Sequence, residues 1–424
     1  MRVLLISANT ERVNILPLPL GLNCVAVAVR EAGHEVRFLD LIAEGPESSA
    51  VGDAIASFDP DVIGISVRNI DDQAMENPRF LLEPVKRVVA ECRRLSAAPI
   101  VLGGAGYSLF PDAVLEYLKA DMGIQGEGER AFPVLLDRIG RGEDPTGTPG
   151  LHVRGRGCQG ERTFAADLDD LPLPDAGLFS ASGPDRADCW VPVQSRRGCP
   201  LDCSYCSTAT IEGRAIRKRS PESFVRGLAN LAAAGFRRFY VVDNTFNLPQ
   251  AYARDVCRRL IESGLGVAWR CIFHPGGIDP DLVDLMAGAG CVEASLGFES
   301  GCETILRRMN KKFGTDDIRR ASDLFGRAGI RRMGFLLLGG PGETRETVEE
   351  SLSFVDSLDL ESVKVTIGIR IYPGTAVART AVSEGLLDRD DRLLIPRFYL
   401  VPGLREWLPE TVSRWLAGRP HWTA

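Results

Sequence analysis

The chain has 424 residues, of which 45% are hydrophobic and 25% are charged, as in ordinary globular proteins. This length favours two domains and a tail over a single core. The formal net charge is -7 and the basic residues form no blocks, which argues against a binding surface for nucleic acid or for an anionic membrane.

The chain begins with a short apolar run over residues 1–7, which ends too early for a signal peptide or a membrane span. We interpret this run as the first strand of a cytoplasmic protein. The 11 cysteines are too few for a disulfide scaffold, and eight of them have no spacing typical of ligands. The other three lie close together further along the chain.

Residues 1–145 alternate apolar runs with amphipathic stretches, which is typical of a doubly wound, Rossmann-like α/β domain. Residues 146–189 are rich in Gly, Pro, Asp and Arg, and we interpret them as a linker with room for a small hairpin. The expected strands of the first domain are 3–6, 35–39, 62–66, 100–103 and 122–125, and its expected helices are 22–31, 51–58, 81–95 and 113–118.

A second alternation of strands and helices covers residues 190–385 and predicts a partial (βα)6 barrel of the TIM type. The active site of such a barrel lies at the mouth formed by the carboxyl ends of its strands. Residues 386–424 are expected to form a short tail on the barrel. The expected barrel strands are 191–195, 239–242, 267–272, 292–296, 333–338 and 363–371.

Cys199, Cys203 and Cys206 have the spacing Cys-x3-Cys-x2-Cys on the loop that follows the first barrel strand. Three thiolates can bind three irons of a four-iron, four-sulfur cluster and leave the fourth iron open to another ligand. A structural zinc site is the alternative, but it needs a fourth Cys or His, and none of the four histidines is close in sequence.

With Tyr205 before the third cysteine, this motif resembles that of the radical S-adenosylmethionine (SAM) superfamily, and the resemblance extends over residues 190–385. It implies that the open iron binds SAM. Reductive cleavage of SAM then releases a 5′-deoxyadenosyl radical, and the electron comes from an external donor such as flavodoxin or ferredoxin.

The resemblance also implies that the ends of later strands hold SAM. Asp243 and Asn244 end the second barrel strand, and Asp243 would accept hydrogen bonds from the ammonium group of SAM; helix capping is the alternative for it. Glu299, at the end of the fourth strand, would face the ribose or the ammonium. The other residues assigned to SAM at the fourth and fifth strands are Ser300, Gly339, Gly340, Gly342 and Glu343.

The sixth barrel strand ends in a Pro-Gly-Thr turn that resembles the family's turn near the adenine of SAM. Tyr372 and Pro373 are assigned to this contact. Arg370 could reach a carboxylate of cofactor or substrate, although an exposed arginine without a ligand is equally compatible with the sequence.

The first domain resembles the cobalamin-binding domain that is fused to one large branch of this superfamily. Small residues after its strands would let the backbone approach a large flat ligand. The residues assigned to cobalamin on this basis are Leu20, Gly21, Gly103, Gly104, Gly106, Tyr107, Gly126 and Glu127.

The loop over residues 7–12 lacks the histidine with which many cobalamin proteins coordinate cobalt. His34 stands before the amino end of an expected strand, which is the wrong end for a ligand, so we interpret it as structural. The resemblance therefore implies base-off cobalamin with no protein histidine on cobalt. Arg68 and Asn69 follow the third strand and would cover the lower face of the ligand; arginine cannot coordinate cobalt. The alternative is a domain that has lost cobalamin and only organises the structure.

Together these resemblances imply a cobalamin-dependent C-methyltransferase, in which the 5′-deoxyadenosyl radical activates a carbon of the substrate and methylcobalamin supplies the methyl group. Rearrangement, ring contraction or cyclisation without methyl transfer is the first alternative. A protein that binds cluster and corrinoid without turnover is the second. The substrate is expected to be a small molecule or a peptide, and no nucleic acid or membrane partner is expected.

Overall fold

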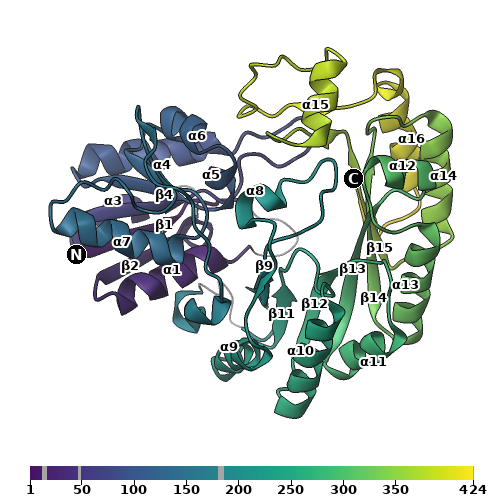
Figure 1. Ribbon diagram of the computed structural model, residues 1–424, viewed down its shortest axis with the longest axis horizontal. Coiled ribbons are helices and arrows are strands. Elements are labelled where there is room, and N and C mark those ends of the chain that lie inside the picture. Colours follow the sequence, from purple (N-terminus) through teal and green to yellow (C-terminus); the bar gives the residue numbers. More distant parts are fainter. Residues whose placement is uncertain (12–16, 46–48, 180–185, 424) are drawn as a thin grey trace.

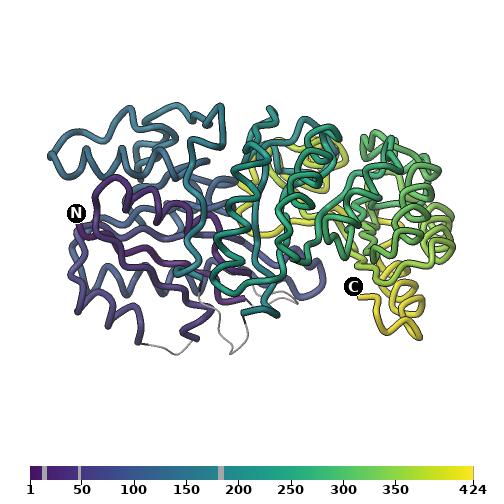
Figure 2. The backbone as a smooth tube through the Cα atoms, turned by 90° about the horizontal axis from the view of Figure 1, so that it is seen from below, coloured from purple at the N-terminus to yellow at the C-terminus, as the bar shows by residue number. Residues whose placement is uncertain are grey.

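The computed structural model of the chain describes residues 1–11, 17–45, 49–179 and 186–423. Within them, the first part of the chain builds one seven-stranded sheet and the later part builds another. The two sheets and their helices lie side by side along the long axis of the molecule (Figures 1 and 2). The expected combination of a doubly wound domain and a partial barrel is therefore confirmed.

The first sheet has the strand order β2-β1-β3-β4-β5-β6-β7, and β1 to β5 run parallel. The chain reverses its direction of travel between β1 and β3, which is where open α/β sheets bind ligands at the carboxyl ends of their strands. The strands are β1 (Arg2–Ser7), β2 (Glu35–Asp40), β3 (Val62–Ser66), β4 (Ile100–Gly103) and β5 (Met122–Ile124), followed by β6 (Leu151–Val153) and β7 (Gly157–Cys158).

The buried strands of this sheet carry apolar side chains on both faces, and helices cover both faces. Leu5 packs with α1 and α7, whereas Leu4 packs with α3 and α4. The helix α7 was not expected from the sequence, since it begins with a glycine and contains Pro133, both unfavourable in helices. The helices are α1 (Leu20–Glu31), α2 (Leu41–Glu44), α3 (Ala50–Phe58), α4 (Leu82–Leu95), α5 (Ala105–Leu109), α6 (Pro111–Leu118) and α7 (Gly128–Gly140).

The segment expected as a linker begins with a hairpin that belongs to the first sheet. In it, β6 pairs antiparallel with β5, and β7 pairs antiparallel with β6. Two short 3-10 helices follow, η1 (Leu168–Asp170) and η2 (Ala176–Leu178). The first sheet therefore extends beyond residue 145.

The second sheet is parallel throughout, with the order β18-β15-β14-β13-β12-β11-β8. Six of its strands follow chain order, as expected for a partial barrel, and β18 from the end of the chain pairs with β15. The strands are β8 (Trp190–Val193), β11 (Arg238–Val241), β12 (Ala268–Phe273), β13 (Cys291–Glu299), β14 (Arg331–Leu338), β15 (Ser362–Ile367) and β18 (Trp422–Thr423).

Two small two-stranded sheets lie beside the barrel: β9 (Arg196–Arg197) with β10 (Arg217–Lys218), and β16 (Ile369–Arg370) with β17 (Phe398–Tyr399). The helices that line the outer side of the barrel sheet are α9 (Pro221–Ala233), α10 (Gln250–Ser263), α11 (Pro280–Gly288), α12 (Glu303–Arg308), α13 (Thr315–Arg327), α14 (Arg345–Asp356) and α16 (Trp407–Leu416), with the 3-10 helix η3 (Pro402–Leu404) before α16 (Figure 1). The helix α8 (Thr208–Glu212) lies between the two sheets instead, and α15 (Ala376–Ser383) lies above them in this view (Figure 1).

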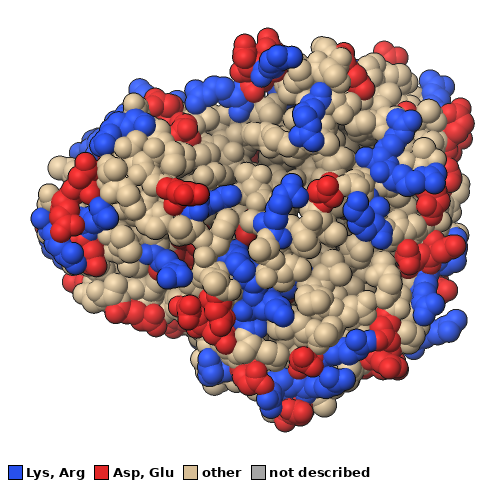
Figure 3. Space-filling view, in the orientation of Figure 1, with Lys and Arg blue, Asp and Glu red and all other residues tan. Residues whose placement is uncertain are grey.

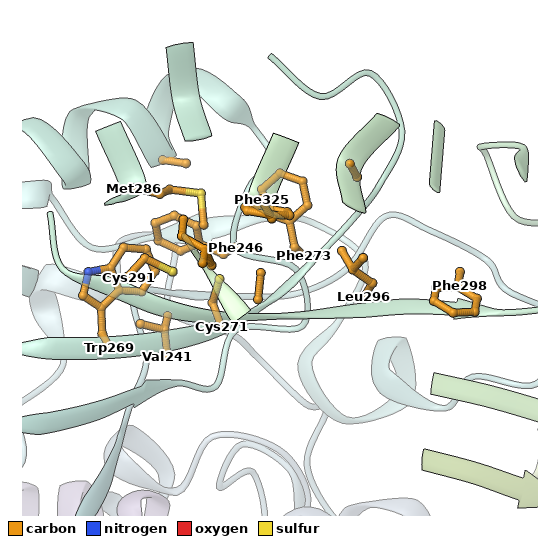
Figure 4. Packing of buried hydrophobic residues seen from close by; sticks show 14 of the residues in the cluster. Val241, Phe246, Trp269, Cys271, Phe273, Met286, Cys291, Leu296, Phe298 and Phe325 are labelled. Atoms are coloured by element: carbon orange, nitrogen blue, oxygen red, sulfur yellow. The ribbon is translucent and has the colours of Figure 1, made fainter. Parts of the chain in front are cut away.

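Alternate residues of β12 face opposite sides of the barrel wall. Trp269 and Phe273 pack against aromatic side chains on the helix side, with ring centroids 4.9 Å from Phe246 and 4.8 Å from Phe325 (Figure 4). Arg270 lies between them on the strand and therefore faces the interior, where its guanidinium is 4.3 Å from the centroid of the Trp190 ring. The apolar core thus lies between sheet and helices, and the interior is free to carry polar groups.

The end of the chain packs on the outer side of the barrel. Trp415 and Trp422 lie with ring centroids 4.8 Å apart, and Trp415 donates a hydrogen bond of 3.0 Å to Asp356 at the end of α14. None of the helices in the described ranges has the length and apolar character needed to cross a bilayer. Positive and negative side chains alternate over the face seen in Figure 3, which is hollowed near its centre.

Gly123 in β5 offers a test of the packing in the first domain. A Cβ atom at this position would lie 2.3 Å from the ring of the fully buried Tyr107. Gly123→Ala should therefore lower the free energy of unfolding by about 1–3 kcal/mol, as overpacked cores do, in urea titrations. The strand glycine Gly103 has no atom within 4 Å of such a Cβ. Gly103→Ala is the control and should leave stability unchanged; an equal loss in both variants would contradict this packing.

Candidate active site

The three cysteines lie on the loop between β9 and α8, at the mouth of the barrel. Cys199 is buried, Cys203 is half-buried and Cys206 is exposed, and all three are free thiols. Among the described residues, no group of three or more His, Cys, Asp or Glu side chains is arranged to hold a single metal ion. A four-iron cluster binds each thiolate through a different iron and does not require the thiolates to meet at one point.

Tyr205 ties this cysteine loop to β13. Its hydroxyl donates to Glu299 Oε1 at 3.0 Å and accepts from Lys311 Nζ at 3.0 Å. Lys311 also donates to the carbonyl oxygen of Gly297 at 2.9 Å. Glu299 has a φ of 68°, which is a strained conformation for a residue other than glycine and is enriched at functional sites. Glu299 therefore lies beside the cysteine loop, where the sequence predicted a cofactor contact.

Asp243 is bonded within the protein. Its side chain is fully buried, and Oδ1 accepts hydrogen bonds from the backbone N–H groups of Ser195 at 2.8 Å and Arg196 at 3.2 Å. Its other oxygen, Oδ2, accepts from the Ser195 hydroxyl. Burial raises the pKa of Asp243 to about 6, although Arg196 and these donors oppose the shift. The carboxylate thus holds the segment that leads into the cysteine loop, and its contact with the ammonium group of SAM stays a prediction.

Asn244 belongs to a second set of contacts on the same segment. Its amide donates to Glu212 Oε2 at 2.6 Å, and the same oxygen accepts from the backbone N–H of Gly198 at 3.0 Å. The other Glu212 oxygen accepts from Gln194 at 2.9 Å. Glu212 at the end of α8 was not singled out from the sequence, yet it holds the residue that precedes Cys199.

The turn after β14 contains the predicted residues Gly339, Gly340, Gly342 and Glu343. Glu343 is buried, and one of its oxygens accepts from the backbone N–H groups of Gly339 and Gly340, the latter at 2.8 Å. Burial raises the pKa of Glu343 to about 7 against the effect of these two donors. Ser300 is also buried, with its hydroxyl 3.0 Å from that of Ser351. Both side chains thus shape the strand ends from within the protein.

Arg370 is buried, not exposed, and its guanidinium is bonded within the protein. Its Nε donates to Asp71 Oδ2 at 2.8 Å, and its other nitrogens donate to the carbonyl oxygens of Ile371 at 2.6 Å and Leu393 at 2.9 Å. Both members of the ion pair are at most 3% exposed. Arg370 therefore joins the barrel to the loop after β3 and has no free face for a cofactor carboxylate. Tyr372 packs over this guanidinium at 5.1 Å, and Pro373 follows in the turn before α15.

A cavity of about 350 Å³ lies at the carboxyl ends of β1, β3, β4 and β5 and continues between the sheet and the helices α1 and α7. Its volume is in the range of roughly 300–1,000 Å³ that ligand pockets occupy. The barrel closes it with Pro192, Gln194, Arg197, Ile211, Glu212 and Val242. Of the residues assigned to cobalamin, those that line it are Leu20, Gly21, Arg68, Gly103, Gly104, Gly126 and Glu127.

Three residues assigned to cobalamin, Asn69, Gly106 and Tyr107, are not among those that line the cavity. Tyr107 is fully buried against Gly123 and belongs to the core on the other face of the sheet. The sequence does not reveal on which face of the sheet the side chain of Tyr107 lies, because a position shortly after a strand fixes no direction for a side chain. Gly106 instead lets α5 pack closely on the backbone of Arg68. A Cβ atom at position 106 would lie 2.9 Å from the carbonyl oxygen of Arg68.

The cavity is lined mainly by small and apolar residues. Gly104 has a φ of 99°, and a Cβ there would lie 2.6 Å from the carbonyl oxygen of Val67, so only glycine suits this bend. Most of the wall is apolar, with charged groups at the side that faces the barrel. Arg68 is exposed to this space and has no hydrogen bond or ion pair with the described residues.

His274 is a further residue that the sequence did not assign to the site. It follows β12 on the interior face, and Asn247 bonds both its N–H and its carbonyl oxygen at 2.8 Å. Its Nδ1 accepts from the N–H of Gly276 at 3.2 Å, and Nε2 is buried without a partner among the described residues. Burial and the nearby Lys311 lower the pKa of His274 to about 4, so its ring is neutral near pH 7. Its place directly after a barrel strand is the sequence signal that could have identified it as a candidate site residue.

Comparisons with known proteins agree with this arrangement. Residues 193–355 match the family model of the radical SAM superfamily, and residues 8–136 match that of the B12 binding domain. An uncharacterised methyltransferase of Pyrococcus horikoshii is 28% identical over 400 residues, which cover 91% of this chain and 84% of the relative. Tryptophan 2-C-methyltransferase of Streptomyces laurentii is 24% identical over 442 residues, which cover 89% of this chain and 74% of the relative.

Solved structures show the same fold. The radical SAM methyltransferase TsrM from Kitasatospora setae, with tryptophan substrate and a SAM analogue bound, superposes with a TM-score of 0.88 at 23% identity, over 99% of this chain and 90% of that one. The cobalamin-dependent SAM radical enzyme OxsB with aqua-cobalamin bound gives a TM-score of 0.79 at 16% identity, over 99% of this chain and 67% of that one.

The buried Glu343 should make stability depend on pH. Its pKa of about 7 in the folded protein lies above the ordinary 4.5, so the folded chain binds this proton more tightly than the unfolded chain. Stability from this group is therefore full below pH 4.5 and falls as the pH rises towards 7, by at most about 1.4 kcal/mol per pH unit. Glu343→Gln should flatten that slope in urea titrations of cluster-free protein; parallel profiles for the two proteins would contradict it.

Proposed function

Because the chain belongs to the radical SAM superfamily and carries a B12-binding domain ahead of its radical SAM domain, we propose that it is a cobalamin-dependent methyltransferase that methylates a carbon atom of its substrate. The observation that carries the proposal is the shared cavity. Its floor is the glycine-rich edge of the first sheet, and its other wall is the barrel segment that leads into the cysteine loop. A corrinoid held there would lie beside Gln194 and Arg197, the residues that lead into the cysteine loop.

When bound, the cluster and SAM supply a 5′-deoxyadenosyl radical after one-electron reduction, and cobalamin supplies the methyl group. For the chain itself, we assign Cys199, Cys203 and Cys206 to the cluster. Glu299 and the turn at Gly339 and Gly340 remain our candidates for SAM, since they lie at neighbouring strand ends of the mouth. Asp243 stays a predicted contact of SAM, and both Asp243 and Arg370 are structural supports for this set.

We propose that Arg68 faces the lower side of base-off cobalamin. It lines the cavity and has no partner among the described residues, and its guanidinium cannot coordinate cobalt. A cation there would leave the metal weakly coordinated from below. Leu20, Gly21 and Gly104 would lie against the ligand, because they line the same wall and present little side-chain bulk or only apolar surface.

The substrate is proposed to be a small molecule. Relatives are named for methylating tryptophan and cytidylyl-2-hydroxyethylphosphonate, which are both small but chemically unlike each other. Of the interior groups, His274 offers an uncharged N–H donor at the barrel mouth, so it is our candidate for orienting a substrate acceptor atom. An external donor such as flavodoxin or ferredoxin would supply the electron, and the exposed Cys206 marks the side of the loop nearest solvent.

We propose that residues 1–145 form the cobalamin-binding domain and residues 190–385 the radical SAM barrel. Residues 146–189 would connect them and residues 386–424 would form the tail. The hairpin of β6 and β7 pairs with the first sheet, which supports counting residues 151–158 with the cobalamin-binding domain.

Cys203→Ala tests the catalytic assignment. Reconstituted wild-type protein incubated anaerobically with SAM, reductant and hydroxocobalamin should form 5′-deoxyadenosine together with S-adenosylhomocysteine, because both uses of SAM are proposed. The variant should lose the brown absorbance of the cluster and form no 5′-deoxyadenosine above background, since one iron loses its ligand. Cys158→Ala, at an exposed cysteine outside the motif, is the control. If 5′-deoxyadenosine forms without S-adenosylhomocysteine, methyl transfer is the part that fails.

Arg68→His tests the lower face of cobalamin. Electron paramagnetic resonance of bound cob(II)alamin should show no splitting from a nitrogen ligand in the wild type. An imidazole at position 68 should introduce such splitting, and 15N-labelled histidine should change its pattern. Arg68→Gln is the control and should resemble the wild type. Nitrogen splitting in the wild-type protein would contradict the base-off assignment.

A further inference from the structure

Two carboxylates of the first domain reach across to the segment that enters the cysteine loop. Glu129 Oε1 is 2.5 Å from Arg197 Nη2, and Glu127 Oε1 is 3.2 Å from Arg197 Nη1. Glu127 also pairs with Arg217 of β10. Arg197 and Arg217 face each other in the small sheet of β9 and β10, so the carboxylates bind a paired element of the barrel domain.

These groups are withdrawn from water. The side chains of Glu127 and Glu129 are 6% and 4% exposed, and that of Arg197 is 13% exposed. Removing one partner of a buried ion pair leaves the other charge uncompensated, which is strongly destabilising. Burial alone would raise the pKa of Glu129, but the Arg197 charge outweighs it and holds this pKa below its usual range. The buried ion pairs therefore hold Arg197 in one position relative to Glu127 and Glu129.

The same residues serve the cavity and the cysteine loop. Glu127, Glu129 and Arg197 line the cavity. Arg197 lies two residues before Cys199, and its Nε donates to Gln194 at 2.9 Å. The next residue, Gly198, is held by Glu212, another group that lines the cavity. A ligand that presses on this wall thus meets the side chains that position the first cluster cysteine.

We propose that Glu129, together with Glu127, is a positioning residue for the cysteine loop, acts through Arg197, and couples cobalamin binding to cluster binding. The inference rests on the proposed function, because it takes the cavity to hold cobalamin and the cysteines to hold the cluster. Coupling between two ligands is reciprocal. Cobalamin therefore holds the cluster more firmly, and the cluster raises the affinity for cobalamin by the same factor.

A second buried ion pair between the domains provides a matched control. Asp71 and Arg370 join the loop after β3 to the barrel, and the other partners of Arg370 are the carbonyl oxygens of Ile371 and Leu393. Among the described residues, no hydrogen bond or ion pair joins these four groups to residues 194–199. Asp71→Asn removes one charge of a buried pair between the domains and leaves the contacts of Glu127 and Glu129 with Arg197 in place.

The experiment measures the dissociation constant of hydroxocobalamin by absorbance for full-length protein with and without its cluster. In the wild type the cluster should tighten binding about tenfold, within the usual range of coupling between sites. Glu129→Gln keeps the shape and an acceptor oxygen but loses the charge, and it should bring the two constants within about twofold of each other. Asp71→Asn should keep the tenfold ratio even if both constants change.

Equal constants in the wild type, or an undiminished ratio in Glu129→Gln, would overturn the inference. If Glu129→Gln fails to fold, Arg197→Lys takes its place, because it keeps the charge but loses the paired geometry of the guanidinium. Failure of the wild type to retain any hydroxocobalamin would instead contradict the proposed function of the first domain.

A second measurement needs no cobalamin and separates the two failures. The rate at which a chelator removes iron from the reconstituted cluster should rise several-fold in Glu129→Gln, because Arg197 then holds the loop less firmly. The rate in Asp71→Asn should equal that of the wild type. Equal rates in all three proteins would overturn the positioning role of Glu129, whether or not cobalamin binds.

Discussion

The site depends on the hydrogen bonds that two carboxylates accept from backbone N–H groups of residues 195–198. A loop with three cysteines close together cannot pack a core of its own, and its backbone groups need partners once water is excluded. Asp243 supplies them to Ser195 and Arg196, and Glu212 supplies them to Gly198. Asp243 follows β11 and Glu212 ends α8, so the loop is fixed by the elements that surround the mouth.

Much of this architecture could be predicted because it depends on local sequence. Buried parallel strands are recognisable as apolar runs, and the expected strands 62–66 and 100–103 match β3 and β4. The cysteine motif is compact and needs no knowledge of distant residues. The helix α7 escaped prediction because its packing overrides the poor helix propensity of Gly128 and Pro133.

The roles of individual polar side chains were harder to predict, because their partners lie far away in the sequence. Arg370 finds Asp71 across 299 positions, and Asp243 finds Ser195 across 48. A residue type suited to bind a cofactor is equally suited to bind a complementary side chain of the protein. Only the fold decides between these outcomes, as Tyr107 also shows by packing on the face of the sheet away from the cavity.

The depth of the cavity has a consequence for the stability of the first domain. Leu5, Val25 and Phe132 line it and also pack in the core between the sheet and the helices α1 and α7. A ligand bound in this cavity would therefore also contact the core of the first domain. A ligand that binds only the folded state stabilises that state. If cobalamin binds there as proposed, it would raise the free energy of unfolding of the first domain as well as serve the reaction.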